Sequence, residues 1–137
     1  MIWIIGGTTE ARLAEEALLG KRNFIITVAT EAGREFLKSQ NSIVGRLSET
    51  EMEKFIRTRN VRTILDCSHP FAVEVSKNAA KVADRLGIKY LRVKRPESTA
   101  AAIAGVEYFS TLDTLLARLK NIKGTVLITL GSKHVPD

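Results

Sequence analysis

The amino-acid sequence predicts an α/β fold, and three observations carry this prediction. Short apolar runs rich in β-branched residues alternate with longer stretches whose apolar residues recur every three or four positions. The short runs are almost continuously apolar, which is typical of parallel strands buried on both faces. The chain has 137 residues and 45% hydrophobic content, enough for the core of one domain. We therefore predict a single Rossmann-like domain over residues 1–137, an open, mostly parallel sheet with helices on both faces.

The predicted elements follow one another along the whole chain. The predicted strands are residues 2–5, 23–29, 42–44, 62–66, 89–93, 106–109 and 125–130. The predicted helices are residues 8–19, 31–39, 49–59, 71–86 and 111–120. Ser48 and Glu51 have the spacing of a capping box at the start of the third helix, and Gly87 is placed to end the fourth.

Composition limits the classes of partner. The 21 Lys and Arg against 15 Asp and Glu give a net charge of +6, which favours anionic ligands. The basic residues are scattered and aromatic residues make up only 6%, so we expect no nucleic-acid partner. One cysteine and two histidines predict neither an internal disulfide nor a metal site. Met1 leads directly into a strand and no apolar run reaches about 18 residues, so we expect a cytoplasmic protein without a membrane partner.

Glycines, hydroxyls and basic side chains directly follow most of the predicted strands. These segments are residues 6–10, 30–34, 45–46, 67–70, 94–96 and 131–134. In an open parallel sheet, ligands bind beyond the carboxyl ends of the strands. The sequence therefore predicts a ligand site along that edge.

The first of these segments lies in the opening stretch IIGGTTEAR. Gly6 and Gly7 permit a tight turn, and the helix that starts near Thr8 offers free N–H groups to an anion. Thr8 and Ala11 replace the second and third glycines of the dinucleotide fingerprint GxGxxG, and no Gly-Lys-Ser/Thr of a P-loop follows. The alternative is a tight turn capped by a threonine, without a ligand.

A second segment, DCSHPFA, ends the fourth predicted strand. Pro70 is placed to start the next helix, where its missing N–H costs nothing. Ser68 and His69 are adjacent, which excludes the usual geometry of a nucleophile and its base. His69 can instead donate to a phosphate or a carboxamide, or move a proton. The alternative is a histidine that caps the backbone.

Basic side chains follow two later strands. Arg95 places a guanidinium on the same edge, suited to a phosphate or a carboxylate, and Lys133 follows the last predicted strand. For Arg95 the alternative is a solvated surface residue.

The motifs IIGGTTEAR, DCSHPFA, KRP and ITLGSK, in this order, resemble the precorrin-6A reductase family of corrin biosynthesis. The family motifs are GGTxEA, DATHPFA and RP, so Cys67 and Ser68 stand where the family has alanine and threonine. The aromatic residue often found shortly after RP is absent here. The resemblance implies NADPH-dependent reduction of one double bond of a precorrin or cobalt-precorrin macrocycle, a tetrapyrrole. Family members are nearly twice as long, so we expect this chain to be an amino-terminal half whose carboxyl-terminal partner half is missing.

The resemblance also implies roles for residues of two loops. Gly6, Gly7, Thr8, Thr9 and Glu10 would face the cofactor phosphates. Ser68, His69 and Pro70 would line the same cleft, with His69 as the candidate proton donor. Arg95 and Lys133 would contact the carboxylates of the substrate.

The preference for NADPH has support from the residues themselves. NAD-specific sites usually carry an acid at the end of the second strand, about 20 residues after the glycines. The sequence has Ala29 and Thr30 there, and Glu31 lies one residue further on. Arg34 is available for a 2′-phosphate. We therefore predict Thr30 and Arg34 as further cofactor contacts. A non-catalytic nucleotide-binding or regulatory module is the alternative to an enzyme, and a nucleic-acid binder would show a steep salt dependence.

Overall fold

The computed structural model describes residues 1–94, 105–127 and 129. The chain divides into two compact units, Met1–Pro96 and Glu97–Asp137. The single domain expected over residues 1–137 stays a prediction.

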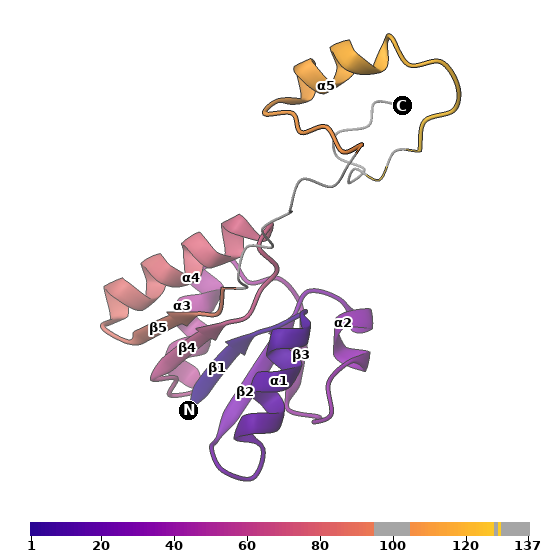
Figure 1. Ribbon diagram of the computed structural model, residues 1–137. Helices are drawn as coiled ribbons and strands as arrows, with labels where there is room; N and C mark the ends of the chain where they lie inside the picture. The colour runs from indigo at the N-terminus through magenta and orange to yellow at the C-terminus, as the bar shows by residue number, and fades with distance from the viewer. Residues whose placement is uncertain (95–104, 128, 130–137) are drawn as a thin grey trace. The chain divides into compact units, whose positions relative to one another are not determined.

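The first unit contains a five-stranded parallel sheet in the order β3-β2-β1-β4-β5 (Figure 1). The strands are β1 (Ile2–Ile5), β2 (Phe24–Val28), β3 (Ser42–Val44), β4 (Thr63–Asp66) and β5 (Lys89–Arg92). The chain adds strands on one side of β1 as far as β3 and then returns to the other side with β4. This reversal is the topological switch point at which doubly wound sheets bind their ligands.

The register brings the carboxyl ends of the central strands to one level. Ile5 lies opposite Thr27 on one side and Asp66 on the other, and Asp66 lies opposite Arg92. The loops that follow β1, β2, β4 and β5 therefore leave the sheet at the same edge, as the sequence predicted for the candidate segments that begin at residues 6, 30, 67 and 94.

Helices cover both faces of the sheet, which confirms the predicted fold class (Figure 1). The helices of this unit are α1 (Thr9–Leu18), α2 (Glu31–Glu35), α3 (Glu49–Thr58) and α4 (Val73–Leu86). On one face Ala11 of α1 packs with Ile4 and Ile26. On the other face Met52 of α3 and Ala79 of α4 belong to a second buried cluster around Trp3, Ile25 and Ile64.

Both predicted helix signals of this unit are confirmed. Ser48 and Glu51 form the capping box at the start of α3, each bonding the other's backbone N–H. Gly87 follows the last residue of α4 with a φ of 63°, in the left-handed region that glycine enters without steric cost.

Helix α2 is shorter than predicted because a buried side chain of α1 captures the backbone beyond it. The carboxylate of Glu15 is fully buried and accepts hydrogen bonds from the N–H groups of Lys38 at 2.9 Å and Ser39 at 2.7 Å. A helix continued to residue 39 would have used these N–H groups for its own ladder. The structure instead ends α2 at Glu35, and the prediction of a helix over 31–39 is wrong in its second half.

The second unit contains one helix among its described residues, α5 (Leu112–Leu119), within the predicted range 111–120. The strand predicted at 106–109 is wrong, and residues 125–127 and 129 are not in a strand either. The rest of the strand predicted at 125–130 lies outside the described residues. A strand forms only against a hydrogen-bonded neighbour. The described residues of this unit provide no such neighbour, so an apolar, β-branched composition is not enough.

Candidate functional site

The loop between β1 and α1 makes a sharp turn at two glycines that serve different purposes. A Cβ on Gly6 would lie 2.8 Å from Cγ2 of Ile26, so only glycine allows the end of β1 to pack this closely against β2. Its N–H donates to Thr27 O at 2.7 Å. Gly7 has a φ of 104°, which side-chain-bearing residues rarely adopt, and a Cβ there would meet no neighbour within 4 Å. Gly6 therefore allows the end of β1 to pack closely against β2, and Gly7 allows the chain to turn towards α1.

Thr8 connects this loop to the loop after β4. Its Oγ1 caps α1 by accepting from the N–H of Ala11 at 3.4 Å, and it donates to the carbonyl oxygen of Cys67 at 2.6 Å. The N–H of Cys67 in turn donates to Ile5 O at 2.9 Å. The first turn of α1 is thus fixed against the end of β4 at the switch point, with the positive end of the helix dipole directed at the strand edge.

The loop after β4 is anchored by the buried carboxylate of Asp66. The carboxylate accepts from the N–H of Ser68 at 3.0 Å, from the hydroxyl of Tyr90 at 2.6 Å and from Nη1 of Arg92 at 3.4 Å. Burial by itself would raise the pKa of Asp66. The hydrogen bonds from Ser76, Tyr90 and Ser68 outweigh burial and hold this pKa below its ordinary value.

Burial and the Asp66 carboxylate also change the pKa values of two neighbouring side chains. Burial, together with the Asp66 carboxylate, raises the pKa of Cys67 to about 11 and the pKa of Tyr90 to about 12. Cys67 is therefore a neutral thiol at physiological pH and no nucleophile. The hydroxyl of Ser68 lies 3.2 Å from that of Ser76, so this loop is tied to the first turn of α4.

His69 is exposed at the tip of this loop, and its ring is held by one hydrogen bond. Nδ1 accepts from the N–H of Phe71 at 3.2 Å, and the two rings are tilted with centroids 5.1 Å apart. Because Nδ1 acts as an acceptor, this hydrogen bond assigns the proton of the neutral imidazole to Nε2. The assigned tautomer makes Nε2–H a donor toward a ligand.

A pocket of about 370 Å³ lies where these loops meet residues 31–39, which comprise α2 and the turn after it and are called the α2 segment below. It is lined by Gly7, Thr8, Thr9, Arg12, Gly33, Phe36, Leu37 and His69. The lining combines a helix N-terminus, a guanidinium, an imidazole and an apolar wall. These groups suit a ligand that has anionic groups next to an aromatic ring.

A family model described as Precorrin-6x reductase CbiJ/CobK matches residues 1–137 of this chain. The chain belongs to this family. The resemblance identified from the sequence motifs is thereby confirmed.

Curated relatives agree with this assignment. The chain is 35% identical over 136 residues to a cobalt-precorrin-6A reductase of Priestia megaterium, covering 97% of this chain and 53% of the relative. It is 27% identical to the Salmonella typhimurium protein of the same name, covering 98% and 52%. It is 34% identical to a precorrin-6A reductase of Rhodococcus erythropolis, covering 70% and 40%. The chain thus spans about half the length of the curated relatives it matches.

A solved structure described as CobK precorrin-6A reductase has the same fold. It matches with a TM-score of 0.64 at 21% identity, covering 74% of this chain and 41% of the other. At this identity the likeness shows the fold alone, and it supports the Rossmann-like open sheet of this family member.

Four of the predicted site residues line the pocket of this chain, namely Gly7, Thr8, Thr9 and His69. The others that the structure describes do not line it, and these are Gly6, Glu10, Thr30, Arg34, Ser68 and Pro70. Thr30 caps α2, accepting from the N–H of Gly33 at 3.2 Å. Pro70 lies in the turn before α4, which begins only at Val73. Arg95 and Lys133 lie outside the described residues.

Sequence reasoning missed three lining residues, Arg12, Phe36 and Leu37, and gave Gly33, which lies in the candidate segment 30–34, no role of its own. Arg12 could have been found, because it lies one helical turn after Thr8 and therefore on the same side of α1. Phe36 and Leu37 gave no signal, since the predicted helix over 31–39 treated them as ordinary helix residues.

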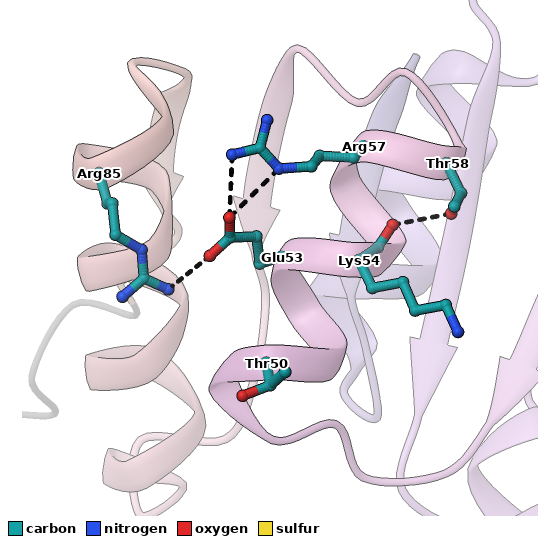
Figure 2. A pocket seen from close by; sticks show the side chains of 6 residues that line it. All are labelled: Thr50, Glu53, Lys54, Arg57, Thr58 and Arg85. Atoms are coloured by element: carbon teal, nitrogen blue, oxygen red, sulfur yellow. Dashed lines mark hydrogen bonds and ion pairs between the residues drawn. The ribbon is translucent and has the colours of Figure 1, made fainter.

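A larger hollow, of about 730 Å³, lies between α3 and α4, away from the strand ends (Figure 2). Three of its charged side chains, Glu53, Arg57 and Arg85, bind one another. Glu53 accepts from Arg57 at 2.9 Å and forms an ion pair with Arg85 at 3.0 Å (Figure 2). The smaller pocket is the candidate ligand site, because it lies at the strand ends and Arg12 in its lining directs only Nη1 to a partner among the described residues, Glu16.

Two classes of feature are not found among the described residues. No group of three or more His, Cys, Asp or Glu side chains in residues 1–94, 105–127 and 129 could hold a metal ion. Over the same residues, no helix is long and apolar enough to cross a membrane.

Proposed function

We propose that this chain supplies the NADPH-binding half of an enzyme that reduces one double bond of a precorrin or cobalt-precorrin macrocycle in cobalamin biosynthesis. The single observation that carries the proposal is the pocket at the switch point, in a chain that belongs to the precorrin-6x reductase family. The relatives named as reductases support the reaction class. NADPH supplies a hydride to such a reaction when it is bound.

The residues of the β1–α1 loop fit the phosphates of this cofactor. The first-turn N–H groups of α1 and the positive end of its dipole favour a pyrophosphate beside Gly7. Gly7 has no side chain to block its approach, and the hydrogen bond from Thr8 to Cys67 keeps the turn in place. In this proposal Gly6 and Glu10 support the loop.

His69 has the geometry of a donor to the bound cofactor or substrate. Its Nε2–H is exposed and the hydrogen bond to Nδ1 orients the ring. Reduction of a double bond needs a proton as well as a hydride. A histidine supplies such a proton as the imidazolium, in which Nδ1 also carries a proton and no longer accepts from the N–H of Phe71. We assign His69 to this step in that form. Ser68 and Pro70 shape the loop that carries it.

The proposal favours NADPH over NADH because β2 is followed by Ala29 and Thr30 instead of an acid. A carboxylate at that point would bond the ribose hydroxyls of NADH and repel a 2′-phosphate. Arg34, which forms an exposed ion pair with Glu31 of its own helix, is the side chain that the sequence assigns to the phosphate.

The experiment is a pair of measurements on the 137-residue chain. Calorimetric titration with NADPH and with NADH should show weak binding that favours NADPH. A hydride-transfer assay, followed by the nicotinamide absorbance with a precorrin substrate, should show no turnover. The physical reason is positioning, which can supply about 7–11 kcal/mol of a barrier and which needs both walls of a cleft.

The outcomes separate the parts of the proposal. Equal or reversed affinity for NADH would contradict the cofactor assignment. Robust turnover would contradict the proposal that a second half is needed. Cofactor binding without turnover in any longer chain that contains this one would favour a non-catalytic nucleotide-binding module.

A further inference from the structure

Arg12 occupies a position that sequence reasoning did not assign. It lies in the second turn of α1 and lines the pocket together with Thr8 and Thr9. Its side chain is 39% exposed, and among the described residues only Nη1 is engaged, by Oε1 of Glu16 at 2.7 Å. A guanidinium has five N–H donors in a planar fork. Arg12 therefore keeps donors for an anion in the pocket.

Arg34, the residue assigned to the 2′-phosphate from the sequence, is placed differently. It does not line the pocket, and its Nη1 forms an ion pair with Glu31 of its own helix at 3.6 Å. Both side chains are largely exposed, so this pair is weak. Arg12 is thus the guanidinium that the fold directs to the ligand.

The α2 segment forms the wall opposite α1. Two adjacent glutamates of α1 hold it there: Glu15 binds the N–H groups of residues 38 and 39, and Glu16 pairs with Nζ of Lys38 at 2.9 Å. Phe36 lines the pocket on this wall and is 74% exposed, so its ring is accessible to a ligand in the pocket.

The position of this wall identifies the part of the cofactor that it would meet. In a doubly wound sheet a dinucleotide crosses the switch point, with its adenosine on the side of β2 and its pyrophosphate at the first helix. Arg12 belongs to α1 and Phe36 to the segment that follows β2, and both line the pocket. The two residues are therefore on the adenosine side.

We infer that Arg12 and Phe36 form the adenosine subsite, in which Arg12 selects the 2′-phosphate and Phe36 stacks on the adenine ring. The inference rests on the proposed function, since it names the residues that read the proposed cofactor. Glu16 orients the guanidinium through Nη1 and leaves the opposite edge of the fork to the phosphate.

Two fragments of the cofactor isolate this subsite, 2′,5′-ADP and 5′-AMP, which differ only in the 2′-phosphate. Calorimetric titration of the 137-residue chain at constant salt should give tighter binding of 2′,5′-ADP. Arg12→Ala should weaken 2′,5′-ADP about tenfold and leave 5′-AMP nearly unchanged, because one charge-assisted contact is lost. Arg22→Ala is the matched control, since it removes the same charge from the exposed turn after α1.

A second pair of variants tests the stacking wall. Phe36→Ala should weaken both fragments equally, by about fivefold or more, because both contain adenine. Leu13→Ala, which removes an exposed apolar side chain of α1 outside the pocket, should change neither.

The outcomes distinguish this inference from the proposed function. If wild type prefers 2′,5′-ADP and Arg34→Ala removes the preference while Arg12→Ala keeps it, the inference is overturned and NADPH binding stands. An unchanged affinity of Phe36→Ala for both fragments overturns the stacking role. If wild type binds neither fragment nor NADPH, both the inference and the cofactor assignment are overturned. Circular dichroism of each variant establishes that it is folded.

Discussion

The two hollows of the first unit contain similar charged side chains but differ in what those side chains bind. Between α3 and α4, Arg57 directs both Nε and Nη2 to Glu53, and Arg85 uses both terminal nitrogens on Glu49 and Glu53. At the strand edge, Arg12 uses one nitrogen, and the backbone of the glycine turn faces the pocket. The two arginines of the larger hollow are therefore engaged within the protein, whereas Arg12 of the smaller one keeps donors for a ligand.

The pocket at the strand ends and the hollow between α3 and α4 also differ in how deeply the carboxylate that anchors each of them is buried. Asp66 is fully buried beneath the pocket loops, whereas Glu53 is partly exposed between two helices. A buried ion pair that loses one partner leaves an uncompensated charge, and an exposed one is replaced by water. This contrast can be tested by replacing each carboxylate with an amide, which removes the charge and keeps the shape of the side chain.

Asp66→Asn should have the largest effect on stability. Arg92 and Tyr90 would lose a charged acceptor inside the protein, and we expect a loss of about 3 kcal/mol in the free energy of unfolding. Urea unfolding measures this loss. A change as small as that of Glu53→Gln would contradict the difference between buried and exposed pairs.

The contribution of Asp66 should also depend on pH. Its pKa in the folded protein is lowered, whereas the unfolded chain has the ordinary value of about 3.9. The stabilisation is therefore fully present above that value and is lost as the pH falls through the lower, folded-state pKa. We expect the difference between wild type and Asp66→Asn to be constant from about pH 7 to 5 and to shrink below about pH 4.

Gly7→Val should have the largest effect on binding. A β-branched side chain at a φ of 104° strains the turn and covers the backbone that approaches the phosphate. We expect NADPH affinity to fall about tenfold or more. Gly20→Val is the matched control, because Gly20 also has a positive φ (73°) and open space but lies at the other end of α1. Equal loss of NADPH binding in both variants would show that strain alone, and not the pocket, is responsible.

Glu53→Gln should have the smallest effect. Both helices remain packed through their apolar faces, and solvent can replace the lost carboxylate. We expect a slight loss of stability that disappears at high salt, with NADPH affinity unchanged. A loss of NADPH affinity would instead show that the hollow between α3 and α4 takes part in binding.

Much of the site could be predicted because a parallel sheet brings its carboxyl ends together. Glycines after β1 and a histidine after β4 were enough to place Gly7 and His69 at one edge, and the structure finds both at one pocket. Arg12 could have been added from its spacing to Thr8 on α1, but Phe36 could not. The place of Phe36 depends on how the chain after β2 packs beside α1, and no local pattern records a contact between two different helices.

The local amino-acid sequence determined where most of the helices and strands of the first unit form. Apolar periodicity set the five strands of the first unit and their helices, and local side chains set the ends of α3 and α4, as the capping box at Ser48 and the left-handed Gly87 show. Tertiary structure decided the points at which distant groups compete for the same backbone. Glu15 ends α2 by taking N–H groups 23 and 24 residues away, and Thr8 ties the glycine turn to a carbonyl 59 residues away. A strand at 106–109 failed for the same reason, because strand pairing is a property of two segments and not of one.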